Sequence, residues 1–402
     1  MNLSLSYSGG TYRGLQLASE FDRRGLLADF YTPFYSKKYP RLNRFLGRIE
    51  EQQVVNTAKV RTNIPFCILR KVLWYTRNLR RAKSHDRFLT SEIIDKWVTK
   101  KIEESSDIFL VESHIALRSM ARAKALGALT FLDRQAANIE FQAAIIAEEY
   151  EKLGLELRQD PRDIEKGIRE YREADAILVP SNFVKDTFEG KSVGLDKIFV
   201  ITPGIELSGY QARDTRRESN VFRVVYCGGI YLEKGIHYLL EAINKTRNKN
   251  IELWLIGIPM ANIQPFLKKY AGCYELKGYM LNNRLKELYS ECDMFVFPTL
   301  QDSFGKVVVE AMACGLPVVV TENAGVKDLV KDGENGFIIP IRDSEALLEK
   351  IMYLYDHRNR CREMGQRALE MVNRSSGLES YADRMLTLFE SKLGQGTLNK
   401  PG

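Results

Sequence analysis

Short apolar runs alternate along the chain with segments in which apolar residues recur every three or four positions. Short runs bounded by turn residues indicate buried strands, and the wider spacing indicates amphipathic helices. In the amino-terminal half the expected strands are residues 2–7, 108–111 and 128–132. In the carboxyl-terminal half they are residues 223–226, 252–256, 274–277, 294–298, 317–321 and 336–339. Strands that alternate with helices in this way predict an α/β fold with two doubly wound, Rossmann-like parallel sheets.

One predicted strand, loop and helix, residues 294–314, offers a binding site for a phosphate group. The strand ends at Pro298, and ligands of open α/β sheets bind at the carboxyl ends of strands. The first turn of the following helix has unpaired backbone N–H groups and the positive end of the helix dipole, which favour an anion. We therefore expect the backbone at Phe304, Gly305 and Lys306 to bind the diphosphate of an activated sugar.

Two carboxylates, Asp302 and Glu310, lie eight residues apart around the start of this helix. Asp302 lies in the loop, where it would accept hydrogen bonds from sugar hydroxyls. Glu310 lies about 6 to 8 Å further along, at a rise of ~1.5 Å per residue, and could reach ribose hydroxyls. The alternative makes Asp302 a helix cap and Glu310 a solvated helix residue. Apolar residues on both sides of Glu310 disfavour that alternative, because a carboxylate among them needs a partner.

The two carboxylates and their spacing resemble the E-x7-E pair of the retaining glycosyltransferases of family four. The neighbouring sequence is also similar, with Gly-Leu-Pro-Val-Val at residues 315–319 and Asn-Ala-Gly-Val-Lys-Asp-Leu-Val at residues 323–330. The similarity is dense over residues 176–350. Asp302 stands where relatives usually have Glu, and its side chain is shorter by one methylene.

The chain is long enough for two or three domains, with residues 202–222 as the expected linker. The resemblance implies the GT-B fold, in which two Rossmann-like domains face a cleft. We therefore expect an acceptor-side domain at residues 1–203 and a nucleotide-sugar-binding domain at residues 204–375. Residues 376–402 would form a helix that crosses back to the first domain, and their apolar stripe is typical of such a helix.

A second family feature is the glycine-rich loop at residues 227–235. Lys234 matches the basic residue that contacts the donor diphosphate, and Gly228 and Gly229 give the backbone freedom to approach it. Many relatives have Arg at the position of Gly229, so one expected positive charge is missing. The alternative interpretation of Lys234 is an ordinary exposed lysine.

The resemblance implies metal-independent transfer with retention at the anomeric carbon, from a UDP-, GDP- or ADP-sugar that is a substrate and not a cofactor. No Asp-x-Asp triplet occurs in the sequence, which agrees with the absence of a carboxylate-held Mg²⁺ or Mn²⁺. Asp302 and Lys234 would act in catalysis, and Lys234 and the helix amides would stabilise the departing phosphate. The leaving phosphate oxygen would take the acceptor proton, so no covalent nucleophile is assigned.

In the amino-terminal half, Gly9 and Gly10 resemble the family's glycine loop at the cleft, and a plain structural turn is the alternative. Asp133, after a predicted strand, is the third catalytic candidate, for contact with the acceptor or the transferred sugar. Arg134 would bind an anionic group of the acceptor. The alternative is a structural ion pair between Asp133 and Arg134. We expect His114 to be structural, because no second ligand or base accompanies it.

Positive charge is concentrated in residues 34–104, where 17 Lys and Arg against 7 Asp and Glu give +10 (17 − 7), compared with +7 for the whole chain. Residues 69–83 interleave these bases with Trp74 and Tyr75. An anionic membrane could attract such a segment, which would suit a lipid-linked acceptor. A solvated basic insert is the alternative. Nucleic-acid binding is not expected, because no recognition motif accompanies the bases.

The sequence has no window of eighteen uninterrupted apolar residues and no signal-peptide pattern, so we expect neither a membrane-spanning helix nor secretion. Its six cysteines lie at least nineteen residues apart, which favours neither a disulfide framework nor a zinc motif. The expected location is the cytoplasm, with peripheral contact at the inner face of the cell membrane as an additional hypothesis.

These features predict a retaining sugar transferase that acts on a hydroxyl of a glycan or lipid-linked acceptor, as in polysaccharide synthesis for the cell envelope. Two alternatives stay open. A nucleotide-sugar epimerase of the same fold would need no acceptor. A non-catalytic partner subunit would bind nucleotide without turnover, and Gly229 and the shortened Asp302 motivate this second alternative. The sugar, the base and the acceptor depend on loop geometry that one sequence does not determine.

Overall fold

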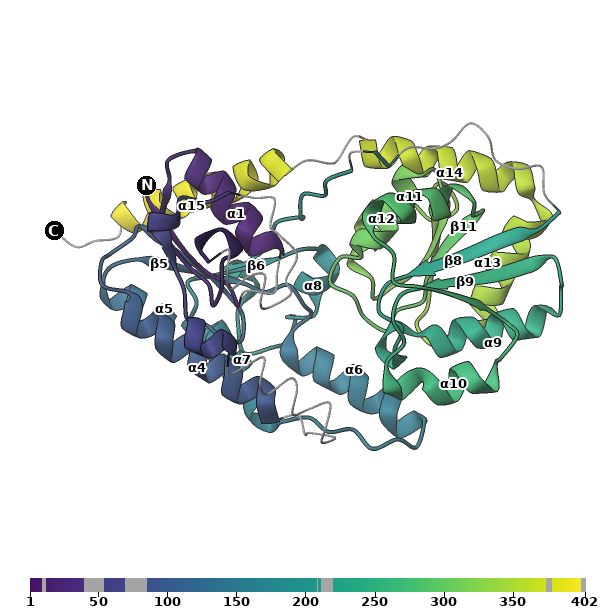
Figure 1. Cartoon of the computed structure of the whole chain (residues 1–402), viewed down its shortest axis with the longest axis horizontal. Helices are drawn as coiled ribbons and strands as arrows, with labels where there is room; N and C mark the ends of the chain where they lie inside the picture. Colours follow the sequence, from purple (N-terminus) through teal and green to yellow (C-terminus); the bar gives the residue numbers. More distant parts are fainter. Residues whose placement is uncertain are drawn as a thin grey trace.

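The computed structural model describes residues 1–8, 12–39, 54–68, 85–207, 209–210, 220–373 and 378–398. Two parallel β-sheets, one of seven strands and one of six, form two domains that are flanked by helices (Figure 1). The basic and aromatic segment 69–83 and the glycines Gly9 and Gly10 lie outside the described residues. The predictions for membrane contact and for the first glycine loop therefore stay predictions.

The first sheet has the strand order β3-β2-β1-β4-β5-β6-β7. Its strands are β1 (Leu3–Ser6), β2 (Leu27–Tyr31), β3 (Val60–Arg61), β4 (Ile108–Glu112), β5 (Leu129–Asp133), β6 (Ala176–Val179) and β7 (Ile198–Val200). The helices of this part are α1 (Tyr12–Arg23), α4 (His85–Lys101), α5 (Leu117–Ala125), α6 (Ile139–Lys152), α7 (Pro161–Glu173) and α8 (Asn182–Asp186). Its short 3-10 turns are η1 (Ser36–Lys38), η2 (Thr57–Lys59) and η3 (Leu195–Lys197).

The second sheet has the strand order β10-β9-β8-β11-β12-β13. Its strands are β8 (Phe222–Cys227), β9 (Ile251–Ile256), β10 (Glu275–Gly278), β11 (Met294–Phe297), β12 (Val318–Thr321) and β13 (Gly336–Ile339). The helices and 3-10 turns of this part are α9 (Ile236–Thr246), α10 (Gln264–Lys269), α11 (Asn282–Ser290), α12 (Lys306–Ala313), α13 (Ser344–Asp356), α14 (Arg358–Asn373), η4 (Leu232–Lys234), η5 (Ala261–Ile263) and η6 (Gly325–Leu329). The strand order reverses between β8 and β11, and such a reversal opens a crevice at the carboxyl ends of the strands.

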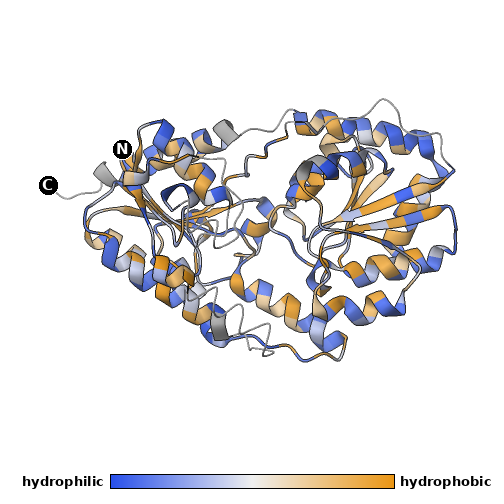
Figure 2. Cartoon of the chain, viewed as in Figure 1, coloured by the Kyte–Doolittle hydropathy of each residue, from blue (hydrophilic) through white to orange (hydrophobic). Residues whose placement is uncertain are grey.

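Most residues of the central strands are buried because helices cover both faces of each sheet. Every residue of β11 and β12 is buried, and β12 consists of three valines and a threonine. Parallel strands covered on both faces require such continuous apolar sequence, and β-branched side chains pack well on the pleated surface. Polar residues are concentrated on the outer faces of the surrounding helices (Figure 2).

The last helix, α15 (Leu378–Leu398), packs on the first domain beside α1 (Figure 1). Its residues Tyr381, Ala382, Met385 and Phe389 are buried in the same apolar cluster as the side chains of β1. The ring centroid of Phe389 lies 4.5 Å from that of Phe131. The predicted fold class, with two doubly wound domains and a helix that returns to the first, is confirmed.

Candidate active site

The loop between β11 and α12, residues 298–305, is fixed by hydrogen bonds to the segment after β12. The Asp302 N–H donates to the Asn323 carbonyl at 3.0 Å, and the Gly325 N–H donates to the Asp302 carbonyl at 2.9 Å. In addition to these two backbone bonds, the Asp302 carboxylate accepts a hydrogen bond from the N–H of Phe304 at 3.0 Å. This carboxylate therefore caps the loop and not the helix, and its second oxygen is left for another partner.

That partner is Lys234, which a close approach of the glycine loop (residues 227–235) places beside Asp302. Gly235 has a left-handed φ of 66°, and a Cβ at this position would lie 1.8 Å from the Pro298 carbonyl oxygen, so only glycine fits. The Lys234 Nζ lies 2.5 Å from the Asp302 Oδ2. Burial lowers the pKa of Lys234, but the Asp302 carboxylate outweighs burial and the pKa is raised. The ammonium group is therefore charged at neutral pH.

Helix α12 begins directly after this loop. Within the described part of the chain, no side chain caps its amino terminus, and Lys306 in its first turn is exposed. Glu310 is half-buried on the same helix. Burial raises the pKa of Glu310, and the charge of Lys306 and the neighbouring Tyr210 hydroxyl offset this only in part. The helix thus presents free amide groups at one end and a carboxylate that holds its proton more strongly than an exposed glutamate.

Most of the residues predicted for donor binding come together at the carboxyl ends of β8 and β11. Those around the ion pair are Asp302, Lys234, Phe304, Gly305 and Lys306. Gly228 and Gly229 lie at the end of β8 in the same glycine loop, where the Tyr226 hydroxyl donates to the Gly229 carbonyl at 2.7 Å. Glu310 lies further along α12. The binding roles of these residues remain predictions.

Asp133 is fully buried at the end of β5. The Tyr7 hydroxyl donates to its Oδ2 at 2.7 Å, the side-chain amide of Gln135 donates to its Oδ1, and an Arg13 nitrogen lies 3.6 Å from Oδ1. The alternative interpretation, an ion pair between Asp133 and Arg134, is wrong, because the arginine beside the Asp133 carboxylate is Arg13. Successive residues of a strand point to opposite faces, which separates the side chains of Asp133 and Arg134.

Arg134 is buried inside the first domain, with an exposed fraction of 1%. Its guanidinium group donates to the Ala137 carbonyl and lies 2.8 Å from the His114 Nε2. Burial and the Arg134 charge hold the pKa of His114 well below its usual value. His114 thus has the surroundings of the structural residue that we predicted. The guanidinium group of Arg134 is used within the fold, so the structure gives no support to its contact with an acceptor.

Glu149 is a buried residue of the domain interface to which sequence reasoning assigned no role. It lies on α6 of the first domain with an exposed fraction of 0%, and the His237 Nε2 of the second domain lies 2.7 Å from its carboxylate. The sequence signal that could have identified Glu149 is its spacing of four residues from Ile145. Residues four apart share one face of a helix, so this carboxylate lies on an apolar face where it needs a partner.

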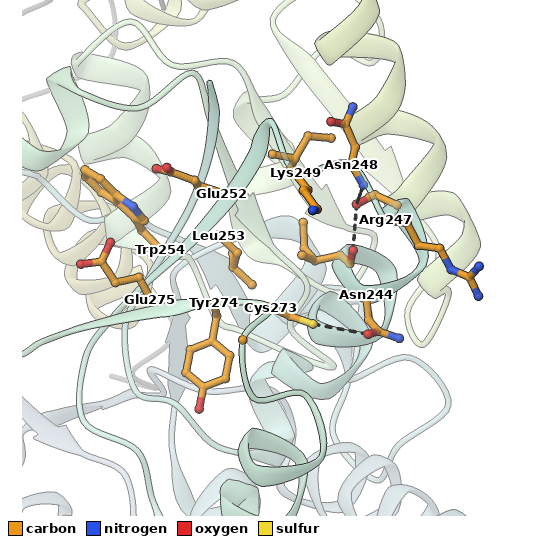
Figure 3. Close-up of a pocket in the computed structure, with 14 residues that line it drawn as sticks. Asn244, Arg247, Asn248, Lys249, Glu252, Leu253, Trp254, Cys273, Tyr274 and Glu275 are labelled. Atoms are coloured by element: carbon orange, nitrogen blue, oxygen red, sulfur yellow. Dashed lines mark hydrogen bonds between the residues drawn. The ribbon is translucent and has the colours of Figure 1, made fainter. Parts of the chain in front are cut away.

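A separate cavity of about 580 Å³ lies at the opposite edge of the second sheet, where β9 and β10 begin and α9 ends (Figure 3). Trp254 lies at one side of it and Arg247 at the other. The charged groups of Arg223 and Lys277 lie 4.8 and 3.8 Å from the centroid of the Trp254 ring. Cations already lie over this ring, so the Trp254 ring does not serve as an aromatic platform for a sugar.

In the part of the chain that the structure describes, no group of three or more His, Cys, Asp or Glu residues is arranged to hold a metal ion. Metal-independent transfer stays a prediction. The described helices also include none that is both long and apolar enough to cross a membrane.

Comparison with solved structures defines the class of fold. The chain superposes on the Anabaena protein HepE, solved in complex with UDP and glucose, with a TM-score of 0.67 and 15% identity over 97% of this chain and 100% of HepE. It superposes on the sucrose-phosphate synthase of Thermosynechococcus elongatus with a TM-score of 0.72 and 17% identity over 98% and 100% of the two chains. The fold is the two-domain GT-B fold.

Comparison of sequences finds a family match over part of the chain. Residues 221–357 match the family described as Glycosyl transferases group 1. The putative glycosyltransferase EpsD of Bacillus subtilis is 27% identical over 215 residues, which cover 52% of this chain and 56% of EpsD. The capsular polysaccharide biosynthesis glycosyltransferase CapM of Staphylococcus aureus is 25% identical over 228 residues, which cover 54% and 59% of the two proteins. The chain thus spans about half the length of these curated relatives.

Proposed function

We propose that this chain transfers a sugar from a nucleotide-diphosphate donor to a hydroxyl of a glycan or lipid-linked acceptor, with retention at the anomeric carbon and without a metal ion. The observation that carries this proposal is the contact of 2.5 Å between the Lys234 Nζ and the Asp302 Oδ2 beside the free amino end of α12. A cation, a carboxylate and free amide groups meet there at the crevice of the second sheet.

Each donor-side residue has a role that follows from its charge. The amide groups at Gly305 and Lys306 and the ammonium of Lys234 bind the diphosphate, because fixed positive groups stabilise the charge that develops as it leaves. The Phe304 N–H already donates to the Asp302 carboxylate, so Phe304 acts by holding Asp302 in place. Asp302 accepts hydrogen bonds from the sugar hydroxyls. Glu310 accepts them from the ribose, since a carboxylate forms stronger hydrogen bonds than a neutral acceptor.

The transfer step requires no covalent enzyme intermediate. The bond between the anomeric carbon and the leaving phosphate oxygen breaks, and the acceptor hydroxyl oxygen forms the new bond on the same face of the sugar. The acceptor proton passes to the phosphate oxygen. Lys234 lowers the barrier by stabilising the negative charge of the diphosphate. On the acceptor side, Asp133 orders Tyr7, Arg13 and Gln135 where the first sheet faces the cleft.

The names of similar proteins support the substrate classes. HepE binds UDP and glucose, and the relative from Staphylococcus aureus acts in capsular polysaccharide biosynthesis. These names favour a nucleotide-sugar donor and a polysaccharide precursor as acceptor. They favour neither the epimerase nor the non-catalytic subunit.

The proposal is tested by nucleotide binding and by turnover. UDP, GDP or ADP should raise the melting temperature, and one of the corresponding sugar donors should be hydrolysed slowly or transferred. Lys234→Ala should lower kcat by roughly 10²- to 10³-fold, the usual loss when one preorganised donor to a developing anion is removed. Lys249→Ala, which removes an exposed lysine far from the loop, should retain activity and serves as the matched control.

Three outcomes would contradict the proposal. A chain that is stabilised by none of the three nucleotides has no donor site. A new nucleotide-sugar isomer in the NMR spectrum, without acceptor, identifies an epimerase. Nucleotide binding without hydrolysis or transfer across a panel of glycan and lipid-linked acceptors identifies a non-catalytic subunit.

A further inference from the structure

The two segments that carry the Lys234–Asp302 pair are each held by a side chain of the first domain. The first contact is made by Ser181, the residue before α8, whose Oγ donates to the Ser303 carbonyl at 2.8 Å. Ser303 follows Asp302 directly, so this bond joins the first domain to the β11–α12 loop itself. The adjacent Asn182 strengthens the contact, because its backbone N–H donates to the Asp328 carboxylate at 2.8 Å.

Close packing leaves no room for other side chains at this contact. A Cβ at Gly325 would lie 2.1 Å from the Ser303 carbonyl oxygen and 2.4 Å from the Ser181 Oγ. Three segments from two domains therefore meet at van der Waals distance at this position. The β11–α12 loop cannot shift against the first domain without breaking the Ser181 bond.

The second contact is made by Glu149 of α6 and holds the first turn of α9. Its carboxylate lies 2.7 Å from the His237 Nε2, accepts from the Tyr238 hydroxyl at 3.0 Å and accepts from the Arg342 Nε at 2.7 Å. Burial raises the pKa of Glu149, but its partners outweigh burial, first His237 and then Arg342, and keep the carboxylate charged. His237 lies three residues after Lys234, so this contact fixes the end of the glycine loop.

Arg342 adopts a left-handed backbone with φ of 62°, which is costly for a residue with a side chain. Its guanidinium group binds the first domain at three places, the Glu149 carboxylate at 2.7 Å, the Ile145 carbonyl at 3.1 Å and the Glu148 carboxylate at 3.1 Å. The energy of these bonds offsets an unfavourable backbone at the domain boundary.

The two held segments are also joined to each other within the second domain. The Leu300 N–H of the β11–α12 loop donates to the Glu233 carbonyl of the glycine loop at 3.0 Å. The side-chain amide of Asn262 in the second domain donates to the Tyr150 hydroxyl of the first domain at 2.9 Å. The same amide lies 3.4 Å from the Glu233 carboxylate of the glycine loop. Docking of the first domain therefore acts on both segments together.

We propose that Ser181 and Glu149 are positioning residues of the donor site: each holds one of the two segments that carry the Lys234–Asp302 pair, so domain docking sets the geometry of that pair. This inference rests on the proposed function. It assigns to the first domain a role in donor binding through residues that touch neither the sugar nor the diphosphate. The donor site is then complete only when the two domains are docked.

The test compares Ser181→Ala and Glu149→Gln with two controls that change exposed residues of the same types, Ser105→Ala and Glu151→Gln. The Kd for UDP, or for GDP or ADP if that nucleotide is the one bound, is measured together with kcat and KM for the sugar donor. Each positioning variant should raise the Kd and the donor KM about tenfold, and both controls should stay within twofold of the unmodified chain. Small-angle scattering of the double variant should give a larger radius of gyration.

A merely structural role predicts a different pattern. Loss of folded protein would lower the apparent kcat and the melting temperature and leave the Kd of the folded fraction unchanged, and that result would overturn the inference. Ser181→Ala and Glu149→Gln with unchanged Kd and KM would also overturn it, whereas an unmodified chain that binds no nucleotide would instead refute the proposed function. If Glu149→Gln does not fold, Tyr238→Phe replaces it, because this change removes one hydrogen bond to Glu149 and keeps the aromatic ring. A Kd raised about threefold is then the supporting result and an unchanged Kd the contrary one.

Discussion

Glu310 differs from an exposed glutamate in that burial raises its pKa. In the proposed donor site the ionised carboxylate would accept hydrogen bonds from ribose hydroxyls, and protonation would remove part of this capacity. Affinity for the nucleotide should therefore fall as the pH is lowered, beginning at a higher pH than an exposed glutamate would give. Glu310→Gln should weaken binding roughly tenfold at neutral pH, about 1.4 kcal/mol, and flatten the pH dependence. Calorimetric titration with the bound nucleotide between pH 5 and pH 8 measures both effects, and equal slopes for the two proteins would exclude this role.

At the residue scale, the position of each side chain along the chain explains why some site residues could be predicted from the sequence and others could not. Asp302 and Glu310 belong to one continuous segment, where spacing along a loop and helix indicates a phosphate site directly. Tyr7 and Asp133 are 126 positions apart, and Glu149 and His237 are 88 positions apart. Local periodicity contains no information on such pairs, because the fold alone brings them together. Arg134 was misjudged for a related reason: its place after a strand does not specify which face of the sheet its side chain takes.

At the scale of elements, the junction of η4 and α9 requires a glycine at position 235. Gly235→Ala adds a Cβ 1.8 Å from the Pro298 carbonyl oxygen and places Ala in a left-handed conformation, which by itself costs roughly 1–2 kcal/mol. Gly272 provides a matched control, because its φ is also positive, at 91°, but no atom lies within 4 Å of the added Cβ. Urea unfolding should show a clearly larger loss for Gly235→Ala than for Gly272→Ala, together with weaker nucleotide binding. Equal losses would mean that the glycine loop adapts to the side chain.

The buried carboxylate of Glu170, on α7, lies at the amino-terminal end of helix α5. Glu170 accepts the backbone N–H groups of His114 and Ala116 at 2.6 and 2.9 Å. Burial raises its pKa to about 7, although these N–H groups lower it. An unfolded glutamate titrates near ~4.3, so between these values the folded chain holds a proton that the unfolded chain has released. The free energy of unfolding should therefore fall as the pH rises from about 4.5 to about 7, by roughly 1.4 kcal/mol for each unit by which the pKa is raised.

Glu170→Gln removes this titration and keeps one acceptor oxygen for the helix. The variant should lose less stability than the unmodified chain between pH 5 and pH 7.5, and urea unfolding at the two pH values measures the difference. The opposite sign would show that Glu170 is ionised throughout this range in the folded protein.

For the whole molecule, the predicted strands differ from the observed ones by no more than one residue at either end. Their sequences are short apolar runs between turn residues, and the parallel sheet requires this pattern. The first sheet has four further strands, β2, β3, β6 and β7, that the pattern did not identify. β3 has only two residues, and β2 contains an aspartate. The side-chain contacts that dock the two domains could not be predicted, since they join surfaces that are distant in sequence.

The return of α15 to the first domain has a consequence for synthesis on the ribosome. Tyr381, Met385 and Phe389 complete an apolar cluster whose other members include β1, yet they emerge from the exit tunnel last. Domains usually fold from the amino terminus onward during translation. In this chain all strands of the second domain are synthesised before α15, the final helix of the first domain. The first domain is therefore translated first but completes its native packing last.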